Sequence, residues 1–329
     1  MTLPLCSLVI VTYNQEAFIR QTLRAAFAQT YPHLEIVVSD DASTDRTWEI
    51  VQAEAASYTG PHRLTLNRNE RNLGIGGGAG KAIQLAAGEI IVWNDGDDIS
   101  LPNRVQRIVD FFEKQGPQTM MVWSRHEPID SNGKVLGKYK NFKKDARKKA
   151  RTLADIRRRI RIPFGAVTAW RRVVSDSFSP IPSAFGGWDN IIAFRALLMG
   201  KIAPLPEVLV QYRTHNASTT NAPAADDLVK DYRKRAIHRD AWFVQAYSQY
   251  LIDLHHILRV SPERRSELLR IERLIVSQIK KWSVSYEIMT AFPRLSLGML
   301  ARALPRPEFY RYFLLAPLYR LGLYKRRKG

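Results

Sequence analysis

Residues 89–98 read EIIVWNDGDD, an apolar run that ends in a cluster of acidic residues. A short run of β-branched and aromatic side chains is typical of a buried strand, and the acidic cluster begins where that strand would end. Similar runs occupy residues 5–11 and 34–39. Between those two runs, apolar side chains recur at the spacing of one helix face, at Ile19, Leu23, Ala26 and Phe27. This alternation predicts an α/β fold with a mostly parallel sheet flanked by helices.

The remainder of the chain divides into segments of different character. A helix is predicted to begin near Ser100 with Pro102 in its first turn, a second helix covers 187–200, and a strand covers 207–212. Residues 134–161 hold thirteen Lys or Arg against two Asp, which predicts a solvated basic insertion within 126–161. The region after Asn221 is predicted to be mainly helical.

The composition limits the partners and the compartment. The 329 residues include 50 Lys or Arg and 31 Asp or Glu, so the formal net charge is +19. This excess predicts an anionic partner, which nucleic acid, phospholipid headgroups and diphosphate substrates all satisfy. The one cysteine, Cys6, cannot form an intrachain disulfide, which favours a reducing compartment. With no basic leader and no apolar run of about 18 residues, we expect a cytoplasmic protein, with attachment to a membrane surface left open.

The candidate site residues are the polar residues that follow each strand-like run, because ligands of open parallel sheets bind beyond the carboxyl ends of the strands. They are Thr12, Tyr13 and Asn14 after the first run, Asp40, Asp41, Ser43 and Asp45 after the second, and Asn94, Asp95, Asp97 and Asp98 after the third. Residues 43–45 have an alternative role as a helix cap. Three carboxylates within residues 95–98 repel one another unless a cation lies among them. Because Mg²⁺ and Mn²⁺ prefer carboxylate oxygens and share their other positions with phosphate, we predict a metal site there over a solvated acidic loop.

Residues 74–81 read GIGGGAGK and invite comparison with phosphate-binding loops. The P-loop pattern fails because Ile75 stands where its first glycine belongs and Ala82 where its hydroxyl belongs. The dinucleotide-binding pattern fails at Ala79. Two interpretations stay open: small residues ahead of a helix that let the backbone approach a ligand closely, or a plain flexible turn.

Taken together, these segments resemble the family 2 inverting glycosyltransferases, which have the Rossmann-like GT-A fold. The resemblance rests on IVTYN at 10–14, SDDASTD at 39–45, NLG at 72–74, and DGDD at 95–98 with Pro102 four residues further on. It is good over residues 5–115, looser over 162–220 and absent beyond. It implies transfer of a sugar, with inversion, from a nucleotide diphosphate donor to an acceptor hydroxyl in cell-surface polysaccharide or glycolipid synthesis. Mn²⁺ or Mg²⁺ would be the cofactor, and the acceptor a carbohydrate or a lipid-linked sugar.

The resemblance also implies a domain organisation. Residues 1–220 would form the catalytic domain, in which 1–125 bind nucleotide sugar and metal, 126–161 form the basic insertion and 162–220 bind the acceptor. Residues 221–329 would form a helical, basic C-terminal region. Its last part, 294–329, alternates basic residues with Leu, Phe, Tyr and Pro, which favours contact with an anionic membrane surface at the inner face of the plasma membrane. A basic helical face packed on the catalytic domain is the alternative.

Several donor-site roles follow from the matched segments. Thr12, Asp40 and Asp41 would line the nucleotide pocket, with Asp41 accepting a hydrogen bond from the base. Asp95 and Asp97 would be the family's D-x-D element, with Asp97 the direct metal ligand.

Other donor-site positions follow from the same segments. Tyr13, Asn14 and Gly74 belong to them and are predicted to contact substrate. Relatives often carry Ala-Arg-Asn where this chain has GAG at 78–80. The expected cationic contact is therefore missing, and Lys81 is its predicted substitute.

The acceptor side is assigned by a second matched segment. The family's general base is an acid, often in a Glu-Asp pair, about seven residues before an Arg and a terminating Gly. Here Asp189 stands six residues before Arg195, with Gly200 beyond. Asp189 is therefore the predicted base, and its alternative role is a helix N-cap. Trp188 replaces the usual glutamate and is predicted to stack on the acceptor. His215 matches a segment that closes over the donor phosphates, against the alternative of an ordinary histidine.

Rival classes explain less of the sequence. The charge and the basic segment suit a nucleic-acid-binding or membrane-binding protein without catalysis. An acidic strand end would repel nucleic-acid phosphates, however, and the aromatic residues are not interleaved with the basic segment, so no nucleic acid partner is expected. A glycoside hydrolase would use paired carboxylates, but these acids cluster as a metal site requires.

Overall fold

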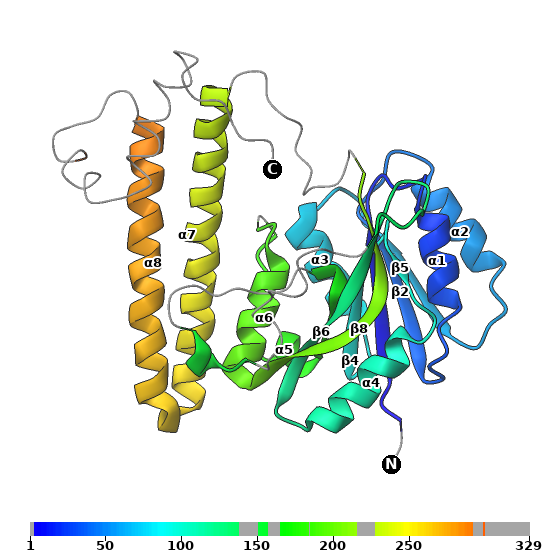
Figure 1. Ribbon diagram of the computed structural model, residues 1–329, viewed down its shortest axis with the longest axis horizontal. Coiled ribbons are helices and arrows are strands. Elements are labelled where there is room, and N and C mark those ends of the chain that lie inside the picture. Colours follow the sequence, from blue (N-terminus) through cyan, green and yellow to red (C-terminus); the bar gives the residue numbers. More distant parts are fainter. Residues whose placement is uncertain are drawn as a thin grey trace. The chain divides into compact units, whose positions relative to one another are not determined.

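The computed structural model of the chain describes residues 3–137, 151–156, 165–183, 185–215, 228–291 and 299. The chain forms two compact units, Met1–Ser218 and Thr219–Gly329. The first holds the sheet and the second a pair of long helices (Figure 1).

A curled sheet of eight strands forms the centre of the first unit. In chain order the strands are β1 (Cys6–Thr12), β2 (Leu34–Asp40), β3 (Arg63–Arg68), β4 (Ile90–Asp95), β5 (Ile99–Ser100), β6 (Thr119–Ile129), β7 (Thr168–Arg171) and β8 (Lys201–Arg213). Their order across the sheet is β3-β2-β1-β4-β7-β6-β8-β5. The pairs β3–β2, β2–β1, β1–β4 and β6–β8 are parallel, whereas β7 runs antiparallel to both β4 and β6, and β5 antiparallel to β8.

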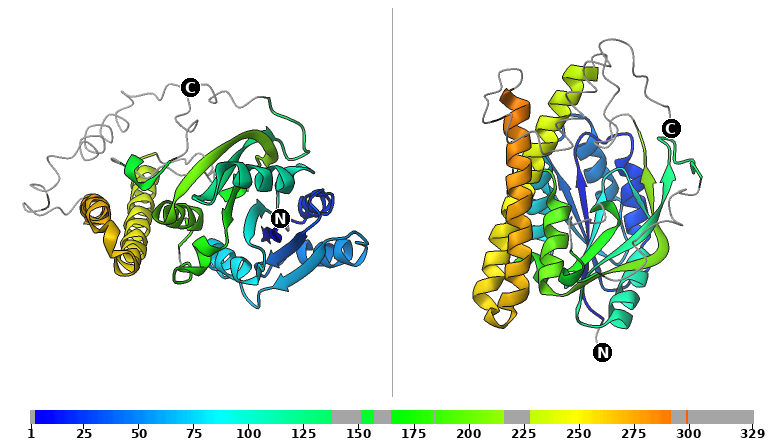
Figure 2. Two further views of the ribbon diagram at one scale, coloured as in Figure 1. Left: turned by 90° about the horizontal axis from the view of Figure 1, so that it is seen from below. Right: turned by 60° about the vertical axis from the view of Figure 1, so that its left-hand side comes forward.

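Helices cover both faces of this sheet (Figures 1 and 2). They are α1 (Ile19–Phe27), α2 (Thr47–Ala56), α3 (Gly74–Leu85), α4 (Arg104–Gln115), the short α5 (Val173–Asp176) and α6 (Trp188–Met199). The main core packs α1, α2 and α4 against alternate strand residues such as Leu8, Ile10 and Val92. Helices α3 and α6 contact the sheet as well as each other. The predicted α/β fold with a helical C-terminal part is confirmed.

The three predicted strands are present and extend one or two residues further at their carboxyl ends, so Thr12, Asp40 and Asp95 are strand residues. The helix predicted from Ser100 begins only at Arg104, because Ser100 is taken up by pairing with Val210 in β8. The strand predicted at 207–212 extends over Lys201–Arg213. The predicted insertion at 126–161 begins inside β6; residues 138–150 and 157–164 of it lie outside the described part of the chain.

The glycine-rich segment is neither a loop nor a turn but the first two turns of α3. Gly74 has φ +74°, a left-handed conformation that favours glycine. A Cβ on Gly76 would lie 2.1 Å from the carbonyl oxygen of Phe185 and one on Gly77 would lie 3.2 Å from Cβ of Ser183. The glycines therefore let the helix pack closely against Pro182, Ser183 and Phe185.

The second unit contains α7 (Leu228–Val260) and α8 (Arg265–Ala291), joined through the short turn η5 (Pro262–Arg264). The rings of Phe243 and Trp282 stack with centroids 4.3 Å apart, and buried Asp240 accepts a hydrogen bond from Ser285 Oγ at 2.5 Å. No described helix combines the length and the apolar composition needed to cross a membrane. The tail predicted to contact a membrane, 294–329, lies outside the described residues apart from Met299.

Candidate active site

The carboxyl ends of β1, β2 and β4 meet at one edge of the sheet. Thr12 is level with Asp40 on β2, and Val11 is level with Asp95 on β4. Parallel pairing thus gathers the polar residues that follow the three runs, as the sequence predicts for a ligand site. The acidic segment 95–98 lies at the carboxyl end of β4, beside that of β1.

Each acid of this loop has a different environment. Asp95 Oδ1 accepts the indole N–H of Trp93 at 2.8 Å. Asp97 Oδ2 lies 2.9 Å from Nε2 of His215, and Asp98 Oδ1 accepts the backbone N–H of Arg213 at 2.8 Å. Burial, together with the neighbouring charges of Asp97 and Asp189, raises the pKa of Asp95 to about 7, against the hydrogen bond from Trp93 and the charge of Arg104. Burial, together with Asp95 and Asp97, likewise holds the pKa of Asp98 well above its usual range.

These acids fit a divalent cation in their chemistry. Oδ2 of Asp98 is buried with no hydrogen-bond partner among the described residues, and burial together with the neighbouring carboxylates raises the pKa of Asp95 and of Asp98. Within the described residues no cluster of three acidic, His or Cys side chains is arranged to hold an ion alone. Asp95 and Asp97 could supply two oxygens, and substrate phosphate and water the others, as Mg²⁺ and Mn²⁺ sites commonly require.

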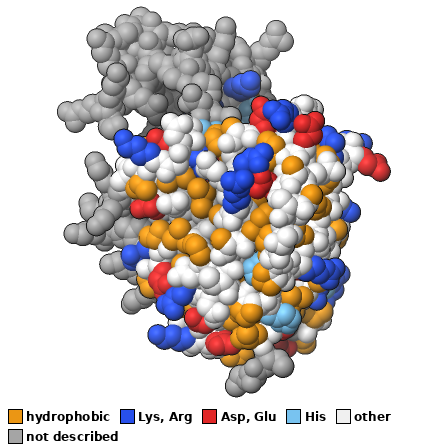
Figure 3. All heavy atoms as spheres, turned by 90° about the vertical axis from the view of Figure 1, so that its right-hand side faces the viewer, with side chains coloured by type: hydrophobic (Ala, Val, Ile, Leu, Met, Phe, Trp, Pro, Cys, Tyr) orange, Lys and Arg blue, Asp and Glu red, His pale blue; other side chains and the backbone are white. Residues whose placement is uncertain are grey.

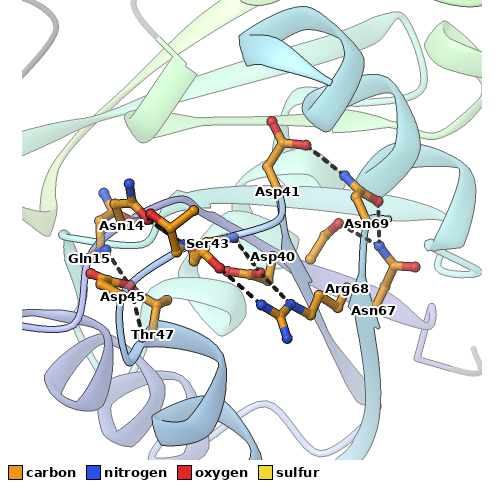
Figure 4. A network of polar contacts seen from close by, with 12 residues as sticks. Asn14, Gln15, Asp40, Asp41, Ser43, Asp45, Thr47, Asn67, Arg68 and Asn69 are labelled. Carbon is orange, nitrogen blue, oxygen red and sulfur yellow. Dashed lines mark hydrogen bonds and ion pairs between the residues drawn. The ribbon is translucent and has the colours of Figure 1, made fainter. Parts of the chain in front are cut away.

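Asp41 stands at the end of β2, where Figure 4 shows it beside β3. Its Oδ1 accepts Asn69 Nδ2 at 2.8 Å and the backbone N–H of Leu73 at 2.9 Å. Its Oδ2 faces α3, where a Cβ on Gly78 would lie 3.3 Å away. The glycine therefore leaves room beside the carboxylate that was predicted to bind the base.

Two predicted substrate contacts instead shape the loop after β2. Asp40 is fully buried, accepts hydrogen bonds from the backbone and hydroxyl of Ser43, and lies 3.6 Å from Nε of Arg68 (Figure 4). Asn14, at φ 51°, accepts the backbone N–H of Thr44 at 2.8 Å. With their oxygens engaged inside the protein, Asp40 and Asn14 hold the loop that presents Asp41.

The other predicted donor contacts differ in exposure. Thr12 is buried and donates its hydroxyl to Gln15 Oε1 at 2.8 Å, whereas the side chain of Tyr13 is 44% exposed at the site edge. Gly74 begins α3. Lys81 lies on an exposed part of the same helix. Asp45 accepts the backbone N–H of Thr47, the first residue of α2, at 2.9 Å, but the N-cap position of α2 belongs to Arg46, so none of residues 43–45 is its N-cap.

Asp189 lies in the first turn of α6. The N-cap position belongs to Gly187, so the alternative in which Asp189 caps the helix is wrong. Its Oδ2 accepts the backbone N–H of Gly165 at 3.1 Å, and its Oδ1 accepts the backbone and side-chain N–H groups of Asn190 at 2.9 and 2.8 Å. Burial raises its pKa above the ordinary 3.8, against these donors. A carboxylate with a raised pKa is suited to accept a proton.

Trp188 does not have the environment of an acceptor-stacking residue. Its side chain is 6% exposed, with its ring centroid 4.0 Å from that of Trp93 and 6.0 Å from that of Trp170. The indole of Trp188 therefore packs inside the protein against two other tryptophans, instead of stacking on the acceptor as predicted. His215, in contrast, is brought to the acidic loop through Asp97 and lies beside the ring of Phe18, with centroids 4.7 Å apart.

Arg104 is a site residue that the sequence analysis missed. It is completely buried and donates to Asn94 Oδ1 at 3.0 Å, Trp93 O at 2.7 Å and Ala166 O at 2.9 Å. Burial lowers its pKa to about 10, against the charges of Asp98 and Asp95. The available signal was its spacing, because Arg104 falls on the same helical stripe as the apolar Ile108 and Phe112.

Comparison with known proteins identifies the family. A model of glycosyl transferase family 2 matches residues 7–170. The chain belongs to that family. This glycosyltransferase is 27% identical over 273 residues to an uncharacterized glycosyltransferase of Nostoc sp., a match that covers 80% of this chain and 79% of the relative. It is also 32% identical over 111 residues to WfaP of Escherichia coli, named a UDP-Glc:α-D-GlcNAc-diphosphoundecaprenol β-1,3-glucosyltransferase, covering 34% of this chain and 42% of the relative.

Solved structures show the same GT-A type of fold for the family 2 chain. TarS 1-349 of S. aureus in complex with UDP-GlcNAc superposes with a TM-score of 0.58 at 17% identity, covering 98% of this chain and 93% of TarS. The mannosyltransferase PcManGT of Pyrobaculum calidifontis, in complex with GDP-Man and Mn²⁺, superposes with a TM-score of 0.52 at 20% identity, covering 99% and 82%.

Proposed function

We propose that the chain transfers a sugar from a nucleotide diphosphate donor to an acceptor hydroxyl, with inversion and with Mn²⁺ or Mg²⁺ as cofactor. The observation that carries the proposal is the proximity of two kinds of acid at one site. Trp93 donates its indole N–H to Asp95 Oδ1 at 2.8 Å, and the centroid of its ring lies 4.0 Å from that of Trp188, the residue before Asp189. A proton acceptor thus lies one aromatic contact away from the carboxylates suited to hold a metal and a diphosphate, and its charge contributes to the raised pKa of Asp95.

The roles follow from these positions. Asp41, Tyr13 and the start of α3 would receive the nucleotide, and Asp95 and Asp97 would hold the cation. A divalent ion bound there would neutralise the charge that develops on the leaving diphosphate. Asp189 would accept the proton of the attacking hydroxyl, and a single displacement on the face opposite the leaving group inverts the anomeric carbon.

The acceptor class is supported by the relatives and by the charge. WfaP is named as a transferase to a diphosphoundecaprenol-linked sugar. A lipid-linked or cell-surface glycan acceptor at the cytoplasmic face of a membrane agrees with the net charge of +19, because anionic lipid attracts a basic protein. Lys81 is exposed on the helix that begins at Gly74, where it could meet donor phosphate.

The test separates the two acids by substitution. Asp97→Ala should abolish binding of UDP or GDP in the presence of Mn²⁺, together with release of UDP or GDP from the matching nucleotide sugar. Asp189→Asn should leave nucleotide binding within about twofold and lower turnover by at least about 10²-fold, a typical contribution of a general base. Isothermal titration calorimetry measures nucleotide binding, and a coupled assay for the released UDP or GDP measures turnover.

Asp110→Asn is the matched control, since this acid lies on α4 with its side chain 45% exposed. It should behave as wild type in both measurements. Equal loss of nucleotide binding in Asp97→Ala and Asp189→Asn would contradict the assigned roles. Failure of wild type to bind any of UDP, GDP or their sugar derivatives with Mn²⁺ would reject the function itself.

A further inference from the structure

Trp93 lies two residues before Asp95 on β4, so the two side chains point to the same face of the sheet. The indole is 1% exposed, and its N–H donates to Asp95 Oδ1 at 2.8 Å. A buried indole has one donor with a fixed direction, so this hydrogen bond favours one orientation of the carboxylate. Asp95 is thereby oriented from inside the protein before any substrate is present.

The same ring contacts the element that carries the proposed base. The centroids of Trp93 and Trp188 are 4.0 Å apart, and Trp188 directly precedes Asp189. Gly165 makes room for this arrangement, because a Cβ there would lie 2.6 Å from Cζ2 of Trp188. The backbone N–H of Gly165 also donates to Asp189 Oδ2 at 3.1 Å. One residue therefore touches both the ring and the carboxylate that follows it.

Arg104 fixes the backbone on both sides of this contact. One nitrogen of its guanidinium donates to the backbone oxygen of Trp93 at 2.7 Å and to that of Ala166 at 2.9 Å. Ala166 directly follows Gly165 in the chain. Because Arg104 is completely buried, water does not compete for these bonds. The ring of Trp93 thus projects from a backbone that is tied to the partner of Asp189.

We propose that Trp93 is a positioning residue that sets the two functional carboxylates relative to each other. Its N–H orients Asp95, and its ring, through Trp188, places the first turn of α6 that carries Asp189. The inference rests on the proposed function, in which Asp95 serves the donor and Asp189 accepts the proton. Groups behind metal-binding residues commonly change affinity or activity about 10- to 100-fold when they are removed.

Trp93→Phe tests the inference, because it removes the N–H and keeps an aromatic ring. Trp170→Phe is the matched control: Trp170 belongs to the same aromatic cluster but donates its N–H to Ser175 Oγ at 2.8 Å, away from the site acids. The probes are UDP-glucose, UDP-N-acetylglucosamine and GDP-mannose with Mn²⁺. The readouts are release of UDP or GDP from these donors and calorimetric binding of UDP or GDP. Trp93→Phe should lower kcat about 10- to 100-fold and weaken Mn²⁺-dependent nucleotide binding, whereas Trp170→Phe should stay within about twofold.

Two further variants keep a loss of stability apart from a loss of positioning. Adding Trp93→Phe to Asp95→Asn should cost little further nucleotide affinity, since the N–H acts through that carboxylate. Trp188→Phe retains the bond between Trp93 and Asp95, so it should keep nucleotide binding and lower kcat. The unfolding midpoints of Trp93→Phe and Trp170→Phe should fall by similar amounts, because each variant loses one partly buried hydrogen bond of 2.8 Å.

The outcomes separate the two hypotheses. An active wild type with equal losses in Trp93→Phe and Trp170→Phe, or additive losses in the double variant with Asp95→Asn, overturns the positioning role alone. A wild type that neither binds UDP or GDP nor releases either from the three donors overturns the proposed function, and the inference with it.

Discussion

At the residue scale, the acids of the site differ in their partners: Asp95 accepts the indole N–H of Trp93, and Asp41 accepts Asn69 Nδ2 and the backbone N–H of Leu73. Asp41, Asp95 and Asp97 stand out because each follows a β-branched run, and the parallel register gathers those ends. Side-chain partners depend on contacts across the fold, which spacing does not encode. Asp40 and Asn14 look like their neighbours in sequence, yet they hold Ser43 and Thr44 of the intervening loop.

Asp189 gives a prediction for the pH dependence. Its pKa is raised above 3.8 by burial, and the base must be deprotonated to accept a proton. Turnover should therefore fall, as the pH is lowered, at a higher pH than an ordinary aspartate would cause. Asn190→Ala removes the side-chain donor that holds the pKa down, so it should move this acid limb to still higher pH. The profile of kcat under saturating donor measures both effects; a limb that moves to lower pH in Asn190→Ala would contradict the assignment.

At the element scale, long periodic segments were predictable and exceptions came from tertiary contacts. Helix α4 starts four residues later than predicted because the chain first pairs with β8 as the two-residue strand β5. The glycine-rich segment carries no apolar stripe, so its helical state was hidden. Its glycines allow Pro182, Ser183 and Phe185 to approach the helix closely, a contact that the sequence spacing does not show.

The glycines of α3 give a prediction with an internal control. In Gly76→Ala the new Cβ would lie 2.1 Å from Phe185 O and 2.8 Å from Pro182 O, so these two residues must shift, at a cost of about 1–3 kcal/mol for overpacking. In Gly80→Ala the nearest atom, Ile181 O, is 3.8 Å away, and alanine favours the helix by up to about 1 kcal/mol. Thermal unfolding should show a lower midpoint for the first variant and an equal or higher one for the second. The first should also lose turnover, because residues 181–186 lead into α6.

At the scale of the whole molecule, the net charge follows directly from the sequence, but it does not tell where on the surface the basic residues gather. The face shown in Figure 3 carries basic and acidic side chains beside one another, so the excess of +19 is not gathered there among the described residues. Nine Lys or Arg and one Glu within 294–329 give that tail +8, which leaves 19 − 8 = +11 for the remainder.

This distribution predicts salt-sensitive attachment to anionic lipid. The full chain should float with vesicles of phosphatidylglycerol and phosphatidylcholine at low salt, detach as salt is raised, and not bind vesicles of phosphatidylcholine alone. The reason is that each basic residue near an anionic lipid surface contributes about 1 kcal/mol to binding. A chain that ends at residue 293 should float markedly less. Undiminished flotation after this truncation would exclude the tail as the attachment segment.

The strand β7 has a consequence for synthesis of the chain. The four residues of β7, Thr168–Arg171, pair with β4 on one side and with β6 on the other. Until β7 has been synthesised, β4 at the edge of the parallel half has unpaired backbone groups. On a ribosome, β4 emerges more than seventy residues before its second neighbour. During that interval an apolar strand with open backbone groups is available to other nascent chains. Slowed translation just upstream of Thr168 would prolong this exposure and increase dependence on chaperones.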